Sequence, residues 1–189
     1  MTTIAIVYHS GYGHTEVIAK AVVEGVERAG ATATLLKIEK ADQDFAPFFE
    51  TIKAADGLIM GAPTYMGGLS APFKAFIDAS SKPWFKQEWK DKIAAGFTNS
   101  GNLNGDKAVS LIQLVTLAMQ HAMIWVGPGL PRDPKFPVGD PNQPNRVGSW
   151  LGVMTQADQA APEVTPPEGD KEFGRILGER VAALAKKLK

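Results

Sequence analysis

The chain has 189 residues, no cysteine, and 20 basic side chains balanced by 20 acidic ones. This length suits one domain with a buried core, and we predict that residues 1–189 form it. The lack of cysteine excludes disulfides and thiolate chemistry, and no metal site is expected. Balanced charge provides no field to attract nucleic acid, and no apolar run approaches the ~20 residues of a membrane span, so we predict a cytoplasmic protein.

The first predicted element is the β-branched run Thr3–Tyr8, whose continuous hydrophobicity is typical of a central strand buried on both faces. Apolar residues at helical spacing follow in Thr15–Ala29, and Gly30 stands where a glycine commonly ends a helix. The remaining predicted elements, in chain order, are strand Thr32–Ile38, helix Phe48–Ala54, strand Gly57–Gly61, helix Ala71–Ala79, strand Lys92–Thr98, helix Asp106–Gln120, strand Ala122–Gly127 and helix Asp170–Lys189.

This regular alternation predicts an α/β fold with a doubly wound parallel sheet, because parallel neighbours need crossover connections that helices can supply. One segment interrupts the alternation. Gly127–Gly148 contains six prolines and four glycines, and a loop of that length is usually functional. We expect an ordered loop beside the site, after which Val147–Val153 completes the fifth strand.

The loop after the first strand, "YHSGYGHTE" at Tyr8–Glu16, is placed to bind an anion, because the amides and dipole of the following helix N-terminus point to it. No lysine or arginine occurs between Thr2 and Ala19, so the loop is not of the nucleoside triphosphate kind. Glu16 replaces the third glycine of a dinucleotide fingerprint. The hydroxyls of Ser10 and Thr15 suit one terminal phosphate, such as that of FMN, although a plain turn capped by Thr15 remains an alternative.

Loops after two further strands agree with a nucleotide site. Gly61–Asp78 places the large side chains of Tyr65 and Met66 at a strand end, where a planar ring could lie along them. The glycines and amides of Phe97–Lys107 offer N–H and C=O groups to a flavin pyrimidine edge. The ends of the first, third and fourth strands meet in one crevice, so together these loops predict a mononucleotide site.

The segments that make up these loops are familiar as a set. They read, in order, "YHSGYGHTEVIAKAVVEGV", "GAPTYMGGLSAPFKAFID", "WFKQEWKDKIAAGFTNSG" and "LVTLAMQHAM". Over roughly its first two-thirds and its final helix, the chain resembles the flavodoxin-like NAD(P)H:quinone oxidoreductases of the WrbA type, within the wider group of FMN-dependent reductases. The resemblance implies a flavodoxin-like five-stranded sheet of order 2-1-3-4-5 with helices on both faces.

The family motifs assign residues to an FMN site. The pattern S-x-Y-G-H wraps the phosphate, P-T-x-x-G lies beside the ring, and a third loop replaces the family's S-T-G-T-G-G. The resemblance also implies a histidine that contacts the flavin and an aromatic lid. Together with the residues picked out by the loops themselves, the predicted site residues are Ser10, Gly11, Tyr12, Gly13, His14 and Thr15 in the first loop, Pro63, Thr64, Tyr65, Met66 and Gly67 in the second, Asn99, Ser100, Gly101, Asn102 and Asn104 in the third, His121 as the histidine and Trp84 as the lid.

The chain departs from the family pattern at three places. Tyr65 and Met66 stand where the family usually has Arg-Phe. The long insertion that the WrbA type carries after its second strand is missing, since only Glu39–Pro47 separates that strand from the next helix. The proline-rich loop is longer than the family pattern. These departures bear on oligomer formation and on the substrate pocket more than on the flavin site.

The implied function is two-electron transfer from NADH or NADPH, through FMN, to a quinone or similar acceptor, by a homodimer or homotetramer. Two alternatives stay open: a flavodoxin-type electron carrier and a non-catalytic FMN-binding module. Carriers of that type are usually strongly acidic, which the balanced charge of this chain does not match.

Three of the named features have structural alternatives. His121 at a helix end is commonly a buried core residue, and Trp84 can simply cover the core. The helix segment Val109–Met119 is apolar almost all round, which indicates either a subunit interface or deep packing.

Overall fold

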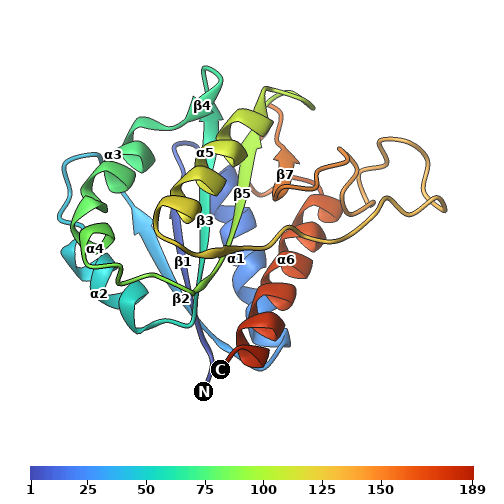
Figure 1. The fold of residues 1–189 in the computed structure, drawn as a ribbon. Helices are drawn as coiled ribbons and strands as arrows, with labels where there is room; N and C mark the ends of the chain where they lie inside the picture. The colour runs from blue at the N-terminus through green and yellow to red at the C-terminus, as the bar shows by residue number, and fades with distance from the viewer.

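The computed structural model describes residues 1–189, and its centre is a parallel sheet (Figure 1). Its strands follow the order β2-β1-β3-β5-β6, and β7 pairs with β5 as well. The short β4 pairs antiparallel with the end of β3, so β5 corresponds to the fourth predicted strand and the predicted order 2-1-3-4-5 is confirmed. The strands are β1 Thr3–His9, β2 Thr32–Ile38, β3 Gly57–Tyr65, β4 Gly68–Leu69, β5 Ile93–Ser100, β6 Ile124–Trp125 and β7 Val153–Gln156.

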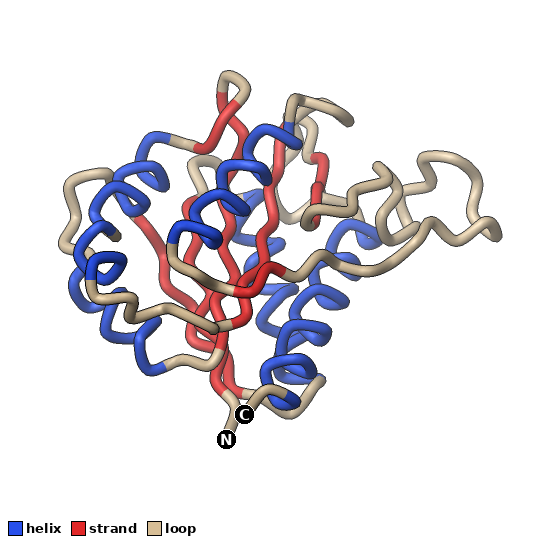
Figure 2. Tube along the Cα trace, in the orientation of Figure 1, coloured by secondary structure: helices blue, strands red, loops and turns tan.

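Helices cover both faces of this sheet, as Figures 1 and 2 show. Successive side chains of β1 point to opposite faces. Ile4 and Ile6 pack with helices α1 and α6, whereas Ala5 and Val7 pack with α2, α3 and α5. The continuous apolar run therefore reflects a strand buried on both sides. The helices are α1 His14–Arg28, α2 Ala46–Ala54, α3 Ala71–Ala79, α4 Ser81–Phe85, α5 Lys107–Gln120 and α6 Glu168–Lys187. None of them is long and apolar enough to cross a membrane.

The fifth strand is built from two separate pieces. β6 pairs with Ile93 and Ala94 at the start of β5, and β7 pairs with Phe97–Ser100 at its end. The proline-rich segment between the two pieces leaves the sheet as a long excursion, drawn in tan in Figure 2. The prediction that the strand resumes after this loop is confirmed, although β6 is shorter than the predicted Ala122–Gly127.

The second site loop differs from its prediction because β3 continues to Tyr65 instead of ending at Gly61. The added length pairs with β5, for instance Pro63 with Asn99, and then turns back into β4. Met66 and Gly67 form the two-residue turn with φ of 46° and 79°, and positive φ at both positions is what a tight hairpin turn needs. Residues expected in a loop along a ring thus lie on a strand and at a hairpin tip. The short helix α4 was not predicted either.

Helices α1 and α6 pack closely through glycine. A Cβ on Gly178 of α6 would lie 2.2 Å from the carbonyl oxygen of Val22, and one on Gly25 of α1 would lie 1.9 Å from that of Arg175. Two backbones in such contact leave no room for a methyl group. The approach brings Arg175 to Glu24 at 2.6 Å, so α6 is held against α1 by packing and by charge.

We predict that Gly178→Ala lowers the free energy of unfolding by about 1–3 kcal/mol, because the new methyl group forces the two helices apart. Alanine favours a helix over glycine by up to ~1 kcal/mol, so a loss has to come from the contact with α1. Urea unfolding measures it, with Glu179→Ala on the exposed face of α6 as control. Equal or greater stability of Gly178→Ala would show that the contact is not tight.

Candidate functional site

A cavity of about 380 Å³ opens at the carboxyl ends of β1, β3, β5 and β7. A volume of this size is typical of small-molecule sites. The three loops predicted to meet do meet here, and the segment after β7 closes the fourth side. The lining residues are Ser10, Tyr12, His14, Thr15, Pro63, Thr64, Tyr65, Asn99, Ser100, Gly101, Ala157, Asp158 and Gln159. The last three were missed, because nothing in the sequence showed where the chain returns after the proline-rich loop.

The first loop turns directly into α1. Gly13 has a φ of 90°, which an L-residue rarely adopts, and a Cβ there would lie 2.9 Å from Pro162. The Ser10 hydroxyl accepts a hydrogen bond from the Glu16 amide at 3.2 Å, and Thr15 is buried. The remaining amides of the first turn have no partner within the helix. These amides point to the cavity end where the sequence predicts an anion site, and the cavity lining contains no lysine or arginine.

His14 has a role that the sequence did not reveal. Its Nε2 lies 2.8 Å from the carbonyl oxygen of Ala160, which can only accept, so Nε2 carries the proton. The contact ties the first loop to the segment after β7, and Gly13 against Pro162 adds a second contact between the same two segments. His14 therefore joins two walls of the cavity.

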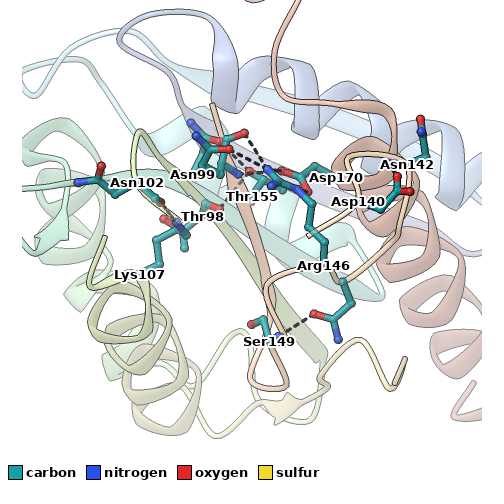
Figure 3. A network of polar contacts seen from close by, with 12 residues as sticks. Thr98, Asn99, Asn102, Lys107, Asp140, Asn142, Arg146, Ser149, Thr155 and Asp170 are labelled. Carbon is teal, nitrogen blue, oxygen red and sulfur yellow. Dashed lines mark hydrogen bonds and ion pairs between the residues drawn. The ribbon is translucent and has the colours of Figure 1, made fainter. Parts of the chain in front are cut away.

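Buried hydroxyl groups support the floor of the cavity. Thr64 Oγ1 lies 2.8 Å from Thr98 Oγ1 and 2.7 Å from Ser110 Oγ, which links β3, β5 and α5. On the other side of β5, the Thr155 hydroxyl donates to Asn99 Oδ1 at 2.8 Å (Figure 3). This bond turns the Asn99 amide so that its N–H groups stay available to a ligand.

Lys107 at the start of α5 is a buried cation behind the third loop. Its Nζ donates to Ser100 Oγ at 2.9 Å and to the Asn102 carbonyl at 2.5 Å (Figure 3). Burial lowers the pKa of Lys107 from 10.5 to about 8, and the nearby Asp170 only partly opposes this. The lysine holds the loop by bonding two of its oxygens. A single lysine at a predicted helix start carries no sequence signal for this role.

Two tyrosines form one rim of the cavity. The rings of Tyr12 and Tyr65 meet edge to face, with centroids 6.1 Å apart, and both are exposed to solvent. A Cβ on Gly11 would lie 2.5 Å from the Tyr65 hydroxyl, so only glycine lets this ring approach the first loop. The rim thus presents two aromatic rings beside the first loop.

Comparison with known proteins agrees with this geometry. The family model described as "NADPH-dependent FMN reductase" matches residues 4–131, which is more than half of the chain. The chain belongs to this family. FMN-dependent oxidoreduction is the activity of the family, so the predicted recognition, cofactor and enzyme class are confirmed.

Relatives match over the full length. "Flavodoxin FldP" of Pseudomonas aeruginosa is 39% identical over 188 residues, covering 100% of this chain and 99% of the relative. An "NAD(P)H dehydrogenase (quinone)" of Azorhizobium caulinodans is 30% identical, covering 100% of this chain and 99% of the relative. The crystal structure titled "flavodoxin, WrbA-like protein" from Agrobacterium tumefaciens is 41% identical with a TM-score of 0.77, and each chain is covered fully.

The cavity of this FMN reductase family member fits FMN. Gly11 and Gly13 lie outside the lining and make room for Tyr65 and Pro162, while the Ser10 and Thr15 hydroxyls and the free amides of the first turn of α1 make a sufficient donor set for a phosphate. The Asn99 amide and the third loop supply polar groups at the opposite side, where a pyrimidine edge needs them. The donors at the two sides of the cavity and the aromatic rim between them fit a flavin mononucleotide.

His121 and Trp84 do not lie in this cavity. The helix α5 begins at the carboxyl edge of the sheet and, being about 21 Å long, carries His121 to the opposite edge. His121 is buried there, lies 3.0 Å from the Ser80 hydroxyl and stacks on Trp89, with centroids 4.1 Å apart. Its burial lowers the pKa to about 4, so the ring is neutral at pH 7. Within one chain the core alternative describes His121, and the flavin contacts expected of His121 and Trp84 stay predictions that this cavity does not support.

Other predicted ligands also lie outside the lining. Met66 projects fully into solvent at the hairpin tip beside Gly67, and Asn102 and Asn104 stand on the exposed part of the third loop. Asn102 still matters through its carbonyl, which Lys107 binds. The motif alignment placed these residues correctly along the chain, but the hairpin and the lysine decide which of them face the cavity.

The lowered pKa of Lys107 predicts a specific pH dependence of stability. Between pH 8 and 10.5 the unfolded lysine still binds its proton while the folded one has lost it, so stability rises with pH in this window. Relative to Lys107→Met, which cannot titrate, the wild type should gain about 2 kcal/mol of unfolding free energy from pH 7 to pH 9.5. Urea unfolding of both proteins at the two pH values measures this. A difference that stays constant would contradict the buried cation.

Proposed function

We propose that this chain binds FMN in the 380 Å³ cavity and catalyses two-electron transfer from NADH or NADPH to a quinone-like acceptor. The observation that carries the proposal is the meeting of the α1 N-terminus with the loops after β3 and β5 around one cavity. The full-length relatives named NAD(P)H dehydrogenase (quinone) support the acceptor class.

Different loops of the chain would bind different parts of FMN. The first loop, with Ser10, Thr15 and the α1 amides, would hold the phosphate, and Asn99 with the loop Ser100–Asn102 would hold the pyrimidine edge. When bound, FMN accepts a hydride from the nicotinamide and passes two electrons to the acceptor. The exposed rim of Tyr12 and Tyr65 offers aromatic surface against which the two substrates can stack in turn. The protein supplies position and hydrogen bonds, so no acid–base pair is required.

An electron carrier is the second candidate, because the relative from Pseudomonas aeruginosa is named a flavodoxin and matches over its full length. Carriers dock to protein partners, and complementary charge speeds that docking. The formal net charge of zero in this chain favours an enzyme with small substrates. The predicted cytoplasmic location stays a prediction, supported by the need for reduced nicotinamide.

We predict that the purified protein binds FMN and that NADH or NADPH bleaches the bound flavin under anaerobic conditions on the time scale of turnover with a quinone. Ser10→Ala should weaken FMN binding about tenfold, because a hydrogen bond to a charged phosphate contributes about 1.5 kcal/mol. Thr51→Ala removes a hydroxyl that bonds the Pro47 carbonyl far from the cavity and is the control. Bound FMN that reduced nicotinamide does not bleach would favour the carrier.

We also propose that the chain forms a homodimer or homotetramer through α5. Val109, Ile112 and Met119 fall on one stripe of this helix, and each side chain is about half exposed. A stripe of this kind is better covered by a second copy than by water. If His121 or Trp84 contacts a flavin at all, a neighbouring copy has to bring it there.

Ile112→Lys should shift the protein to a smaller species in light scattering coupled to size exclusion, because a charge in a packed apolar interface has no partner. Val138→Lys places the same charge on an exposed valine of the proline-rich loop and should leave the mass unchanged. A wild type that is already monomeric at micromolar concentration would exclude the interface.

A further inference from the structure

The proline-rich segment is fastened to the body of the protein near its end. Arg146 donates to Asp170 through Nε at 2.8 Å to Oδ1 and through Nη2 at 3.1 Å to Oδ2 (Figure 3). Both side chains are more than nine-tenths buried. Asp170 lies in the first turn of α6, and its Oδ2 also accepts a hydrogen bond from the backbone N–H of Gln156 at 2.8 Å. One carboxylate thus holds the loop, the last residue of β7 and the start of α6 together.

The arginine also sets the orientation of the Gln156 side chain. Arg146 Nη2 lies 2.9 Å from Gln156 Oε1. A guanidinium has donors only, so the glutamine must turn its oxygen to the arginine and its amide nitrogen away from it. That nitrogen donates to the Gly101 carbonyl at 2.9 Å. The orientation of Gln156 is therefore decided by a residue of the proline-rich segment.

Gly101 belongs to the cavity lining, and its neighbour is held from another side. The Asn102 carbonyl, one peptide further on, accepts the hydrogen bond from Lys107. A trans peptide carries its N–H on the side opposite to its C=O. With both carbonyls engaged by Gln156 and Lys107, the N–H groups of Asn102 and Leu103 point away from these two side chains. The loop cannot rotate these peptides without breaking a bond.

We propose that Gln156, oriented by Arg146, is a positioning residue that fixes the peptides on either side of Gly101, a residue of the cavity lining, for the flavin, so that the proline-rich segment tunes the reduction potential. This inference rests on the proposed FMN site. Fixed N–H donors favour a ring that carries extra negative charge after reduction, because they need no rearrangement when that charge appears. A buried ion pair such as that of Arg146 contributes little to stability but can select one arrangement.

Gln156→Met tests the inference, because methionine has a similar size, lacks the amide and leaves the Arg146–Asp170 pair intact. We expect oxidised FMN to bind about tenfold more weakly in fluorescence titrations. The affinity for reduced FMN should fall by a further factor of about ten. The further factor lowers the two-electron midpoint potential, measured against a reference dye, by about 30 mV. Arg146→Lys keeps a cation beside Asp170 but removes the Nη2 that bonds Gln156 Oε1, and it should shift the potential in the same direction.

Gln87→Met is the matched control, because it removes another glutamine bond to a backbone carbonyl, that of Trp84 at 3.0 Å, far from the cavity. It should leave affinity and potential unchanged. A purely structural role of Gln156 would lower the melting temperature and leave the potential of the bound flavin unchanged, and that result overturns the inference.

A readout without FMN separates this inference from the proposed function. In FMN-free protein, the NMR order parameters of the Asn102 and Leu103 amides should be lower in Gln156→Met than in the wild type, and equal order parameters overturn the inference. A wild type that ignores FMN overturns the proposed function and this inference with it. Wild-type potential in FMN-loaded Gln156→Met overturns the inference alone.

Discussion

The parallel pairing of β5 with both pieces of the fifth strand is the constraint on which the site depends. β5 pairs with β3 on one side and with β6 and then β7 on the other. Because all these strands are parallel, their carboxyl ends lie at one edge, and the loops that follow them must meet there. The return of the chain as β7 adds a fourth loop to the three that the strands before it provide. Without this register, Gln156 would not reach Gly101, and the cavity would lack one wall.

Charge is arranged behind the cavity instead of inside it. The lining contains no lysine or arginine, whereas Lys107, Arg146 and Asp170 are buried beneath the third loop and the end of β7. Two cations and one carboxylate leave a positive excess there. Under the proposed function, amides and hydroxyls at the α1 N-terminus would bind the phosphate, while Lys107 holds the third loop directly and Arg146 holds it through Gln156. A site of this kind would work through oriented dipoles, which need no rearrangement when charge moves.

The sequence predicts the fold and the first loop well because both depend on local patterns. β1 is visible as an apolar run, and Ser10–Thr15 is visible as a loop between a strand and a helix. The other functional contacts depend on residues far apart in the chain, such as Gln156 with Gly101 and His14 with Ala160. No spacing rule reveals such pairs. For His121 the two kinds of prediction disagree, since the motif alignment implies a flavin contact whereas the predicted length of α5 already places this histidine at the far end of the helix from the third loop.

His14 and Gln156 give the segment after β7 a double role. The stretch from Gln156 to Ala160 is bonded to the first loop through the Ala160 carbonyl and to the third loop through the side-chain amide of Gln156. Both ends of a bound mononucleotide would therefore contact loops that are held by the same stretch of chain. Gln156 is the last residue of β7, and Arg146 near the end of the proline-rich segment fixes it directly and through Asp170. A change in the packing of the proline-rich segment is thus transmitted to both ends of the cavity, which explains why a long excursion is anchored by a buried ion pair and not left loose at the surface.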